Sequence, residues 1–335
     1  MLGCIMAEVT LKDLSKSFGP TRALSNVTMT IPDGAFVVLL GPTGAGKTTT
    51  LRLIAGLDRP DAGDIGIAGR SVLGDTPAQR DVAMVFQQYS LYPHLTVRDN
   101  LAFPLRSPVL NWPEPEITRK VAEVADVLRI SHKLDNKATQ LSGGEMQRVS
   151  IGRALVRNPC IYLMDEPLSS LDAKLRADLR IELKRIHSDL GATFLYVTHD
   201  QIEAMTMATH VGVLDQGRLV QFGTPREIYE NPVSTYVASR LGQPRINLLP
   251  ADAFAGAKAG AALIGLRPEH VTIGEGQAAT VRRIEHLGDQ TRLHLTMGRH
   301  QIVTLADPHT PLSPGDALFI RPENPLWFDA SGNRI

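Results

Sequence analysis

The sequence predicts an α/β domain built on a parallel sheet, followed by a small all-β domain. Strand-length apolar runs alternate with helical patterns, and strand–helix–strand order is typical of parallel strands covered by helices. Before the first buried run, an alternating segment with turn signals predicts an antiparallel β-layer. After about residue 239, proline and glycine interrupt short alternating runs. We therefore expect an α/β domain over residues 1–240 and a β-domain over residues 241–335.

The first half of the α/β domain has three parts. Residues 7–32 alternate and carry the turn signals, so they form the expected antiparallel layer. Phe36–Leu40 is a buried strand that leads into a glycine-rich loop and a helix. Residues 89–156 are mostly helical in pattern, which predicts a helical subdomain.

The second half returns to the parallel sheet. Buried strands are expected at Ile161–Met164 and Phe194–Val197. Between them, leucine and isoleucine recur at helical spacing, and Gly191 ends this amphipathic helix.

Composition narrows the function classes. The 35 basic and 35 acidic residues balance, so net charge gives no field for binding polyanions. The longest apolar runs are far shorter than the roughly 20 residues that span a bilayer. The N-terminus has no basic segment followed by an apolar stretch, so we expect no signal peptide. Any work at a membrane then requires docking onto other subunits.

A glycine-rich loop with a lysine and a threonine lies between the first buried strand and its helix. It fits the pattern G-x-x-x-x-G-K-[ST], in which backbone amides converge on phosphate oxygens at a helix N-terminus. Lys47 is expected at the β- and γ-phosphates of ATP, and Thr48 at Mg²⁺. The nucleotide-binding residues expected here are Gly41, Pro42, Thr43, Gly44, Ala45, Gly46, Lys47, Thr48 and Thr49.

Two carboxylates end the strand that begins at Ile161. Adjacent strand residues point to opposite faces, so the two can take separate roles. Asp165 is expected to bind Mg²⁺, and Glu166 to orient or deprotonate the attacking water. An acidic pair at a strand end is otherwise a helix N-cap, but the phosphate loop upstream favours the catalytic interpretation.

A second phosphate-binding terminus is predicted at the start of another helix. Ser142, Gly143, Gly144 and Glu145 follow Leu141, and serine and glycine at a helix start leave amides free for an anion. One loop suffices for one triphosphate, so a second terminus suggests that two chains sandwich each nucleotide. A plain capped helix is the alternative.

These three motifs resemble those of the ABC ATPases in order and approximate spacing. The resemblance implies that Phe18 stacks on adenine and that Gln87 senses Mg²⁺ and the attacking water. It also implies that Asp172 lies in the loop coupling the two sites of a dimer, and that His199 is the switch histidine at the γ-phosphate. The alternatives are a core phenylalanine, an idle surface glutamine, a helix N-cap and a structural histidine.

The C-terminal part resembles the accessory domain of carbohydrate-importing ABC ATPases. Gly265 to Glu269 match the Gly-x-Arg-Pro-Glu motif of that OB-like barrel, which implies dimer contact and binding of a regulatory protein. Few aromatics and no lysine cluster occur here, so no nucleic acid is expected as a partner. The segment Tyr89–Val97 matches the region that receives a short helix from the membrane subunit.

The resemblance implies an ATPase that uses ATP and Mg²⁺ to energise import at the cytoplasmic face of the bacterial inner membrane. Its implied partners are a second copy, two permease subunits and, through them, a periplasmic solute-binding protein. A sugar or sugar derivative is the expected cargo; polyamine, ferric ion or sulfate is the alternative. A non-transport ABC ATPase would need a coiled-coil insert or two fused nucleotide domains, and neither is visible. A pure ATP-binding module would be expected to lose Glu166 or His199.

Overall fold

The computed structural model describes residues 8–108 and 110–335; the N-terminus on which the signal-peptide expectation depends lies outside this range. The chain forms two compact units, Met1–Pro225 and Arg226–Ile335. This division precedes the boundary at residue 240 that the sequence predicts, because the helices after Pro225 bond to the β-rich unit: Arg267 donates to the carbonyls of Tyr229, Ala238 and Leu241.

The core of the first unit is a six-stranded sheet in the order β10-β9-β3-β8-β7-β6. Its central strands are parallel, and β10 alone pairs antiparallel to its neighbour. The residues of β3, β7 and β8 are buried on both faces, as expected for a covered parallel sheet. The strands are β3 (Phe36–Leu40), β6 (Val82–Val85), β7 (Ile161–Asp165), β8 (Thr193–Thr198), β9 (His210–Asp215) and β10 (Arg218–Gly223).

The predicted antiparallel layer is present as a second sheet in the order β2-β1-β4-β5. Its buried residues share one hydrophobic core with helix α1 and with the strands of the parallel sheet, so α1 packs between the two layers. The elements are β1 (Val9–Phe18), β2 (Thr21–Ile31), β4 (Ala62–Ile67), β5 (Arg70–Ser71) and α1 (Lys47–Ala55).

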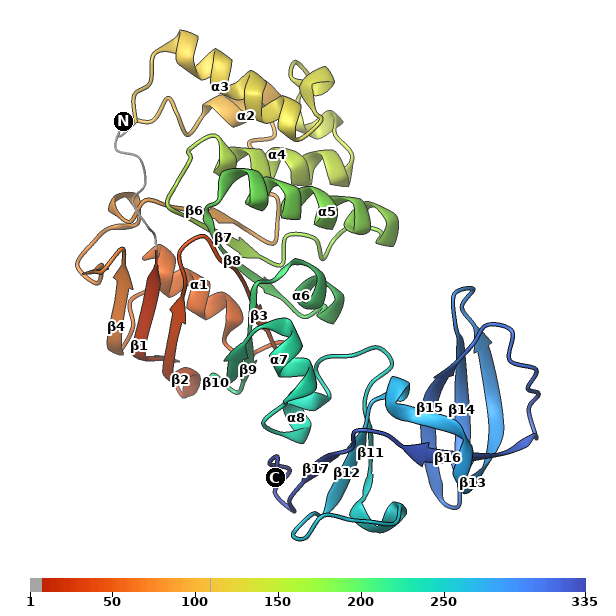
Figure 1. The fold of residues 1–335 in the computed structure, drawn as a ribbon. Helices are drawn as coiled ribbons and strands as arrows, with labels where there is room; N and C mark the ends of the chain where they lie inside the picture. The colour runs from red at the N-terminus through yellow and green to blue at the C-terminus, as the bar shows by residue number, and fades with distance from the viewer. Residues whose placement is uncertain (1–7, 109) are drawn as a thin grey trace. The chain divides into compact units, whose positions relative to one another are not determined.

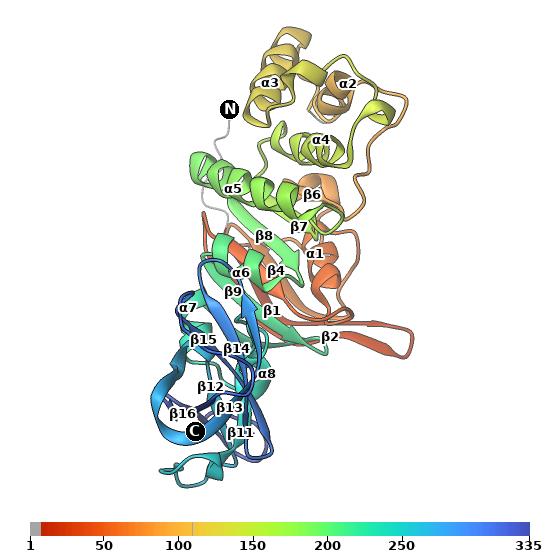
Figure 2. The same ribbon diagram turned by 90° about the vertical axis from the view of Figure 1, so that its right-hand side faces the viewer.

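Helices α2 to α5 form a group beyond the parallel sheet, at the opposite end of the unit from β1 and β2 (Figures 1 and 2), whereas α6 lies against β3 and β8. Helix α5 begins where the Asp172 carboxylate accepts the Leu175 amide, and it ends at Gly191, whose φ of 60° suits glycine. The helices are α2 (Val97–Ala102), α3 (Glu114–Val127), α4 (Gly143–Leu155), α5 (Ala173–Leu190) and α6 (Gln201–Met207).

The second unit combines two short helices with two antiparallel sheets. The sheets have the orders β11-β12-β17 and β15-β14-β13-β16, and alternate residues of β14 face the core. The prediction of a separate all-β accessory fold is confirmed. The elements are α7 (Pro225–Glu230), α8 (Thr235–Ala238), β11 (Asn247–Pro250), β12 (Leu263–Leu266), β13 (Val271–His286), β14 (Thr291–Met297), β15 (His300–Ala306), β16 (Ala317–Pro322) and β17 (Leu326–Phe328).

Among the described residues, no helix has both the length and the apolar composition needed to cross a bilayer.

Candidate active site

The glycine-rich loop runs from the end of β3 into α1, at the carboxyl edge of the parallel sheet. The Lys47 side chain is only 5% exposed, and its ammonium donates to the carbonyls of Gly41 (2.9 Å) and Pro42 (3.1 Å). The loop therefore curls around its own lysine. This is the geometry in which the ammonium faces the space enclosed by the loop amides.

Two glycines make this curl possible. Gly44 and Gly46 have φ values of 81° and 99°, a region that side chains rarely adopt. A Cβ at position 46 would also lie 2.7 Å from the Ala23 carbonyl oxygen, whereas a Cβ at position 44 would meet nothing within 4 Å. Gly46 is thus required by both packing and backbone conformation, and Gly44 by backbone conformation alone.

Thr48 and Asp165 meet across the sheet edge. The Thr48 hydroxyl donates to Asp165 Oδ1 at 2.9 Å, and Asp165 is 6% exposed. Burial raises the pKa of Asp165 above its ordinary value, and the nearby Glu166 carboxylate adds to the rise. A buried carboxylate with a hydroxyl beside it, in a site that disfavours an uncompensated negative charge, fits a divalent cation.

Glu166 connects the phosphate loop to His199. Its Oε1 lies 3.6 Å from the Lys47 ammonium, and its Oε2 lies 3.1 Å from His199 Nδ1. The backbone of Glu166 is held by a bond from its amide to the Val197 carbonyl, at a φ of 44°. A left-handed glutamate is unusual, and such strain is common where a functional side chain must be aimed.

Phe18 and Gln87 lie in the solvent-exposed parts of this region. Phe18 ends β1 with 48% of its surface exposed, and the Lys16 ammonium lies 5.3 Å from its ring centre. The alternative of a core phenylalanine is therefore wrong. Gln87 follows β6, whose last residue pairs with Met164, so the glutamine leaves the same sheet edge as Asp165.

The helix predicted as a second phosphate-binding terminus begins at Gly143. Ser142 is its N-cap, and Glu145 closes a capping box by accepting the Ser142 amide at 2.8 Å. This bond lowers the pKa of Glu145. In the described part of the chain, no hydrogen bond joins this terminus to the phosphate loop. The helix cap is therefore present, and binding of a nucleotide at this terminus stays a prediction.

Asp172 caps α5, as the alternative interpretation expected, and it remains exposed at the end of a tight loop. Within this loop the Ser169 hydroxyl donates to the Glu166 carbonyl at 2.9 Å. Ser170 shares a hydrogen bond of 3.1 Å with the Tyr89 hydroxyl. The loop is thereby fixed to the segments that carry Glu166 and Tyr89.

The structure therefore brings five predicted residues into direct contact: Lys47, Thr48, Asp165, Glu166 and His199. In the described part of the chain, no hydrogen bond or ion pair joins this group to Phe18 at the end of β1, Gln87 after β6, Asp172 at the start of α5 or the Ser142–Glu145 terminus of α4. Sequence reasoning missed Arg176, which bonds the Leu168 and Leu171 carbonyls. Its position one helical turn after the Asp172 cap was the only signal available.

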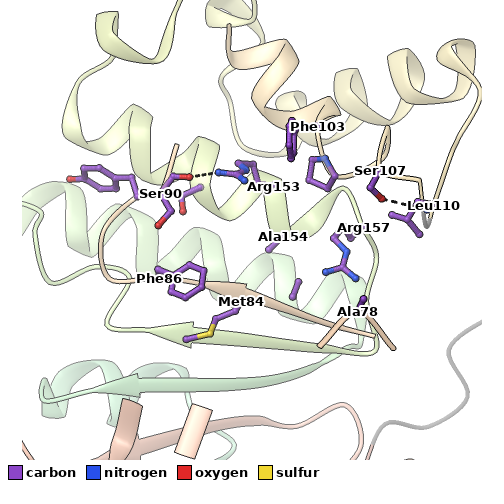
Figure 3. Close-up of a pocket in the computed structure, with 14 residues that line it drawn as sticks. Ala78, Met84, Phe86, Ser90, Phe103, Ser107, Leu110, Arg153, Ala154 and Arg157 are labelled. Carbon is purple, nitrogen blue, oxygen red and sulfur yellow. Dashed lines mark hydrogen bonds between the residues drawn. The ribbon is translucent and has the colours of Figure 1, made fainter. Parts of the chain in front are cut away.

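A groove of about 370 Å³ opens between β6 and the helical group (Figure 3). Phe86 and Phe103 line it with 39% and 46% of their surfaces exposed, and Arg153 donates to the Ser90 carbonyl at its rim. Of the segment Tyr89–Val97, only Tyr89 and Ser90 reach the groove. Half of the lining residues come from the stretch 103–110 and from α4.

Comparison with known proteins finds similarity over most of the chain. The ABC transporter family matches residues 24–169, and the TOBE domain family matches residues 264–326. The sn-glycerol-3-phosphate import ATP-binding protein UgpC of Rhizobium meliloti (strain 1021) is 45% identical, covering 98% of this chain and 100% of that protein. The protein of the same name from Ruegeria sp. (strain TM1040) is 44% identical, covering 98% and 99%.

Solved structures agree on the fold of the first unit. One, cbiO1 from Clostridium perfringens, described as part of the ABC transporter complex cbiONQ, is 26% identical with a TM-score of 0.62 and covers 67% of this chain and 90% of its own. Another, the dimeric MJ0796, a bacterial ABC transporter cassette, is 30% identical with a TM-score of 0.59 and covers 65% and 99%. The chain belongs to the ABC transporter family, as an ATP-binding subunit of the carbohydrate-importer branch that carries a C-terminal TOBE domain.

Proposed function

We propose that this ATPase hydrolyses ATP in the Lys47–Glu166–His199 site and thereby energises import of a sugar derivative. The contact of Glu166 with both Lys47 and His199 carries the assignment. It places the candidate base between the group that would bind the terminal phosphates and the group that would report their presence.

The residues divide the work of phosphoryl transfer to water. The loop amides and Lys47 hold the phosphates, so that the terminal phosphorus faces Glu166. Glu166 orients the attacking water and accepts its proton, while His199 fixes the Glu166 carboxylate through Oε2. Phe18 supplies an exposed ring on which adenine stacks. Catalysis then depends mainly on positioning and charge.

Thr48, Asp165 and Gln87 would hold Mg²⁺. The hydroxyl and the buried carboxylate of the first two already lie 2.9 Å apart, and oxygen ligands of this kind suit the ion. When bound, Mg²⁺ offsets the negative charge of the phosphate oxygens. Asp165 loses the cost of its buried charge when the cation is present, which favours the ionised carboxylate.

A second copy of the chain would complete each site. Ser142 caps the N-terminus of α4, and among the described residues no hydrogen bond joins this terminus to the phosphate loop of the same chain; Asp172, at the start of α5, is exposed. Mixing a Ser142→Arg subunit with a Lys47→Ala subunit tests the sandwich. The mixed dimer should have one doubly damaged site and one intact site, so activity should reappear on mixing. Activity that stayed proportional to monomer at high dilution would contradict the sandwich.

The groove beside Phe86 and Phe103 is the proposed docking site for a short helix of each permease subunit. Its aromatic lining, with Arg153 and Arg157 at the edge, suits the apolar face of a helix. A Phe103→Asp variant should lose association with the permeases while ATP hydrolysis by the isolated chain is retained. Phe319→Asp, which alters an exposed phenylalanine of the other unit, is the matched control.

The cargo is proposed from the relatives, which are named for import of sn-glycerol 3-phosphate. The site binds no cargo, because the solute would meet the periplasmic binding protein and the permeases at the inner membrane. The test is replacement of UgpC in a Rhizobium meliloti strain lacking it, with uptake of radiolabelled sn-glycerol 3-phosphate as the measurement. Restored uptake with this chain, but not with its Glu166→Gln variant, is expected. Assembly with those permeases without uptake would exclude this cargo.

A further inference from the structure

Arg176 of α5 reaches back to the loop that precedes its own helix. Its Nε donates to the Leu168 carbonyl at 3.3 Å, and its Nη2 donates to the Leu171 carbonyl at 2.8 Å. These two carbonyls flank Ser169 and Ser170. One guanidinium therefore holds both ends of the loop that exposes Asp172.

The third nitrogen of the same guanidinium faces the turn that carries His199. Arg176 Nη1 lies 3.9 Å from Asp200 Oδ2, and the two side chains are 31% and 23% exposed. An ion pair of this length and exposure is weak when both side chains are free. Here the bonds to the two carbonyls already fix the guanidinium. Forming the ion pair therefore costs little further side-chain entropy of Arg176.

Asp200 is also hydrogen-bonded to residues that lead into the core. Its other oxygen accepts the Ile202 amide at 2.7 Å, and its own amide donates to the Thr198 hydroxyl at 3.0 Å. Thr198 bonds in turn to Glu203, which is 3% exposed and accepts the Tyr196 hydroxyl at 3.0 Å. Hydrogen bonds thus hold the turn around His199 on the side away from Arg176.

We propose that Arg176 is a positioning residue that ties the Leu168–Asp172 loop to the His199 turn, so that the two move together. The inference rests on the proposed roles of Asp172, which would face the site of the opposite chain, and of His199, which touches Glu166 of its own site. Arg176 is then the side chain through which the state of one nucleotide site reaches the other. Lysine should not replace it, because one ammonium cannot occupy the positions of the three guanidinium nitrogens that contact Leu168, Leu171 and Asp200.

Hydrogen exchange of the full-length, nucleotide-free chain tests the tie directly. In Arg176→Met, amides of residues 168–175 and of residues 199–203 should both exchange about threefold to tenfold faster, because both loops lose a restraint. Arg180→Met is the matched control: Arg180 lies one turn further along α5 and has no such contact in the described part of the chain. It should leave both segments unchanged.

The outcomes separate the possibilities. Faster exchange in residues 168–175 alone would overturn the tie, as would equal acceleration by the Arg180 control. If the methionine variant does not fold, Arg176→Lys replaces it in the experiment. In that variant, amide exchange should stay slow in one of the two segments and become faster in the other. Protection of both segments by lysine would contradict the argument for arginine.

Steady-state kinetics supply the second readout. Arg176→Met should lower kcat about tenfold while KM for ATP stays within about twofold, because Phe18 and the phosphate loop are untouched. Combining it with Asp200→Asn should cost no more than the larger single effect, since both break one path. If the effects of the two substitutions on kcat were fully additive, Arg176 and Asp200 would not act through one connection. If His199→Ala retained normal hydrolysis, the proposed function itself would be wrong. If His199→Ala lost hydrolysis but Arg176→Met left hydrogen exchange unaltered, only the proposed role of Arg176 would be rejected.

Discussion

At the scale of single residues, Glu166 has conflicting requirements. Its φ of 44° favours glycine or asparagine, but its carboxylate contacts Lys47 and His199. The bonds that its amide makes to Val197 and that its carbonyl accepts from Ser169 hold the strained backbone. The fold around β7 and β8 therefore stabilises a conformation that the residue would not adopt alone.

Replacing Glu166 by glutamine should abolish hydrolysis and preserve nucleotide binding. The amide keeps the size and the hydrogen bond but cannot accept the proton of the attacking water, so kcat should fall by at least about 100-fold. Single-turnover hydrolysis and nucleotide affinity measure the two effects, with accumulation of an ATP-bound dimer as a third sign. Lys47→Ala is the comparison, since it should weaken binding itself. Turnover within a few-fold of the parent chain would show that Glu166 is not the base.

Asp165→Asn should stabilise the nucleotide-free protein, most strongly at neutral and alkaline pH. Burial raises the pKa of Asp165 above 3.8, so the folded state holds its proton more tightly than the unfolded state. The folded state therefore loses stability as pH rises through 3.8 to the raised pKa, and an uncharged asparagine avoids that loss. Tm measured across pH should show a gain that shrinks on acidification. Asp178→Asn, at an exposed position on α5, is the control, and a pH-independent gain would contradict the argument.

At the scale of elements, the two glycines at the start of α4 differ in the space available for a side chain. Both Gly143 and Gly144 lie in the first turn, but a Cβ on Gly144 would sit 2.2 Å from Leu175 Cδ2, and one on Gly143 would sit 3.2 Å from the Tyr89 hydroxyl. Of these two glycines, only Gly144 lies against α5.

Gly144→Ala should destabilise the protein, whereas Gly143→Ala should not. The first change overpacks the contact with Leu175, at a cost of about 1–3 kcal/mol, while the second gains helix propensity of up to ~1 kcal/mol. Thermal unfolding should separate the variants by several degrees. Combining Gly144→Ala with Leu175→Ala should recover part of the loss. Equal Tm values for the two single variants would mean that α4 and α5 can separate without cost.

Elements set by local patterns were predictable from the sequence. The apolar runs that became β3, β7 and β8, the Gly191 stop and the alternating segment before Phe36 all act through neighbours in the chain. Arg176, Glu203 and the lining of the groove were not predictable. Their partners lie on other elements, as with the 3.0 Å bond from Tyr196 to Glu203, and only the packed fold brings them together. The direct contact of Glu166 with His199 was not predictable for the same reason, because the two residues are 33 positions apart in the sequence.

At the scale of the whole molecule, the boundary between the units follows buried contacts and not composition. Ala238 packs with Ile246, Leu326 and Phe328, and Arg267 is 2% exposed between the helices and the sheets. Residues 226–240 lack β-patterning, so the sequence assigns them to the preceding domain. Nothing local to that segment reveals that the partners of Ala238 lie between 8 (Ile246) and 90 (Phe328) residues further on.

Truncation should distinguish the two boundaries. A chain ending at Pro225 should fold and bind ATP, because Phe18, the phosphate loop and Asp165 all lie in the first unit. A chain ending at Leu241 should bind ATP as well but aggregate more readily, since the apolar face around Ala238 would lose its cover. Both should associate more weakly than the full chain. Nucleotide affinity, Tm and oligomeric state measured side by side check this; a folded 1–225 chain without ATP affinity would show that the site is misplaced.

The bonds from Lys47 to the Gly41 and Pro42 carbonyls also bear on how quickly a nucleotide can enter. We expect the nucleotide-free chain to keep this closed loop, so that the conformational entropy of the loop is lost during folding and not during binding. Arrival of a phosphate requires one side chain to exchange two carbonyl acceptors for phosphate oxygens. Association should accordingly be limited by diffusion and by that exchange, with no slow loop-ordering phase before it.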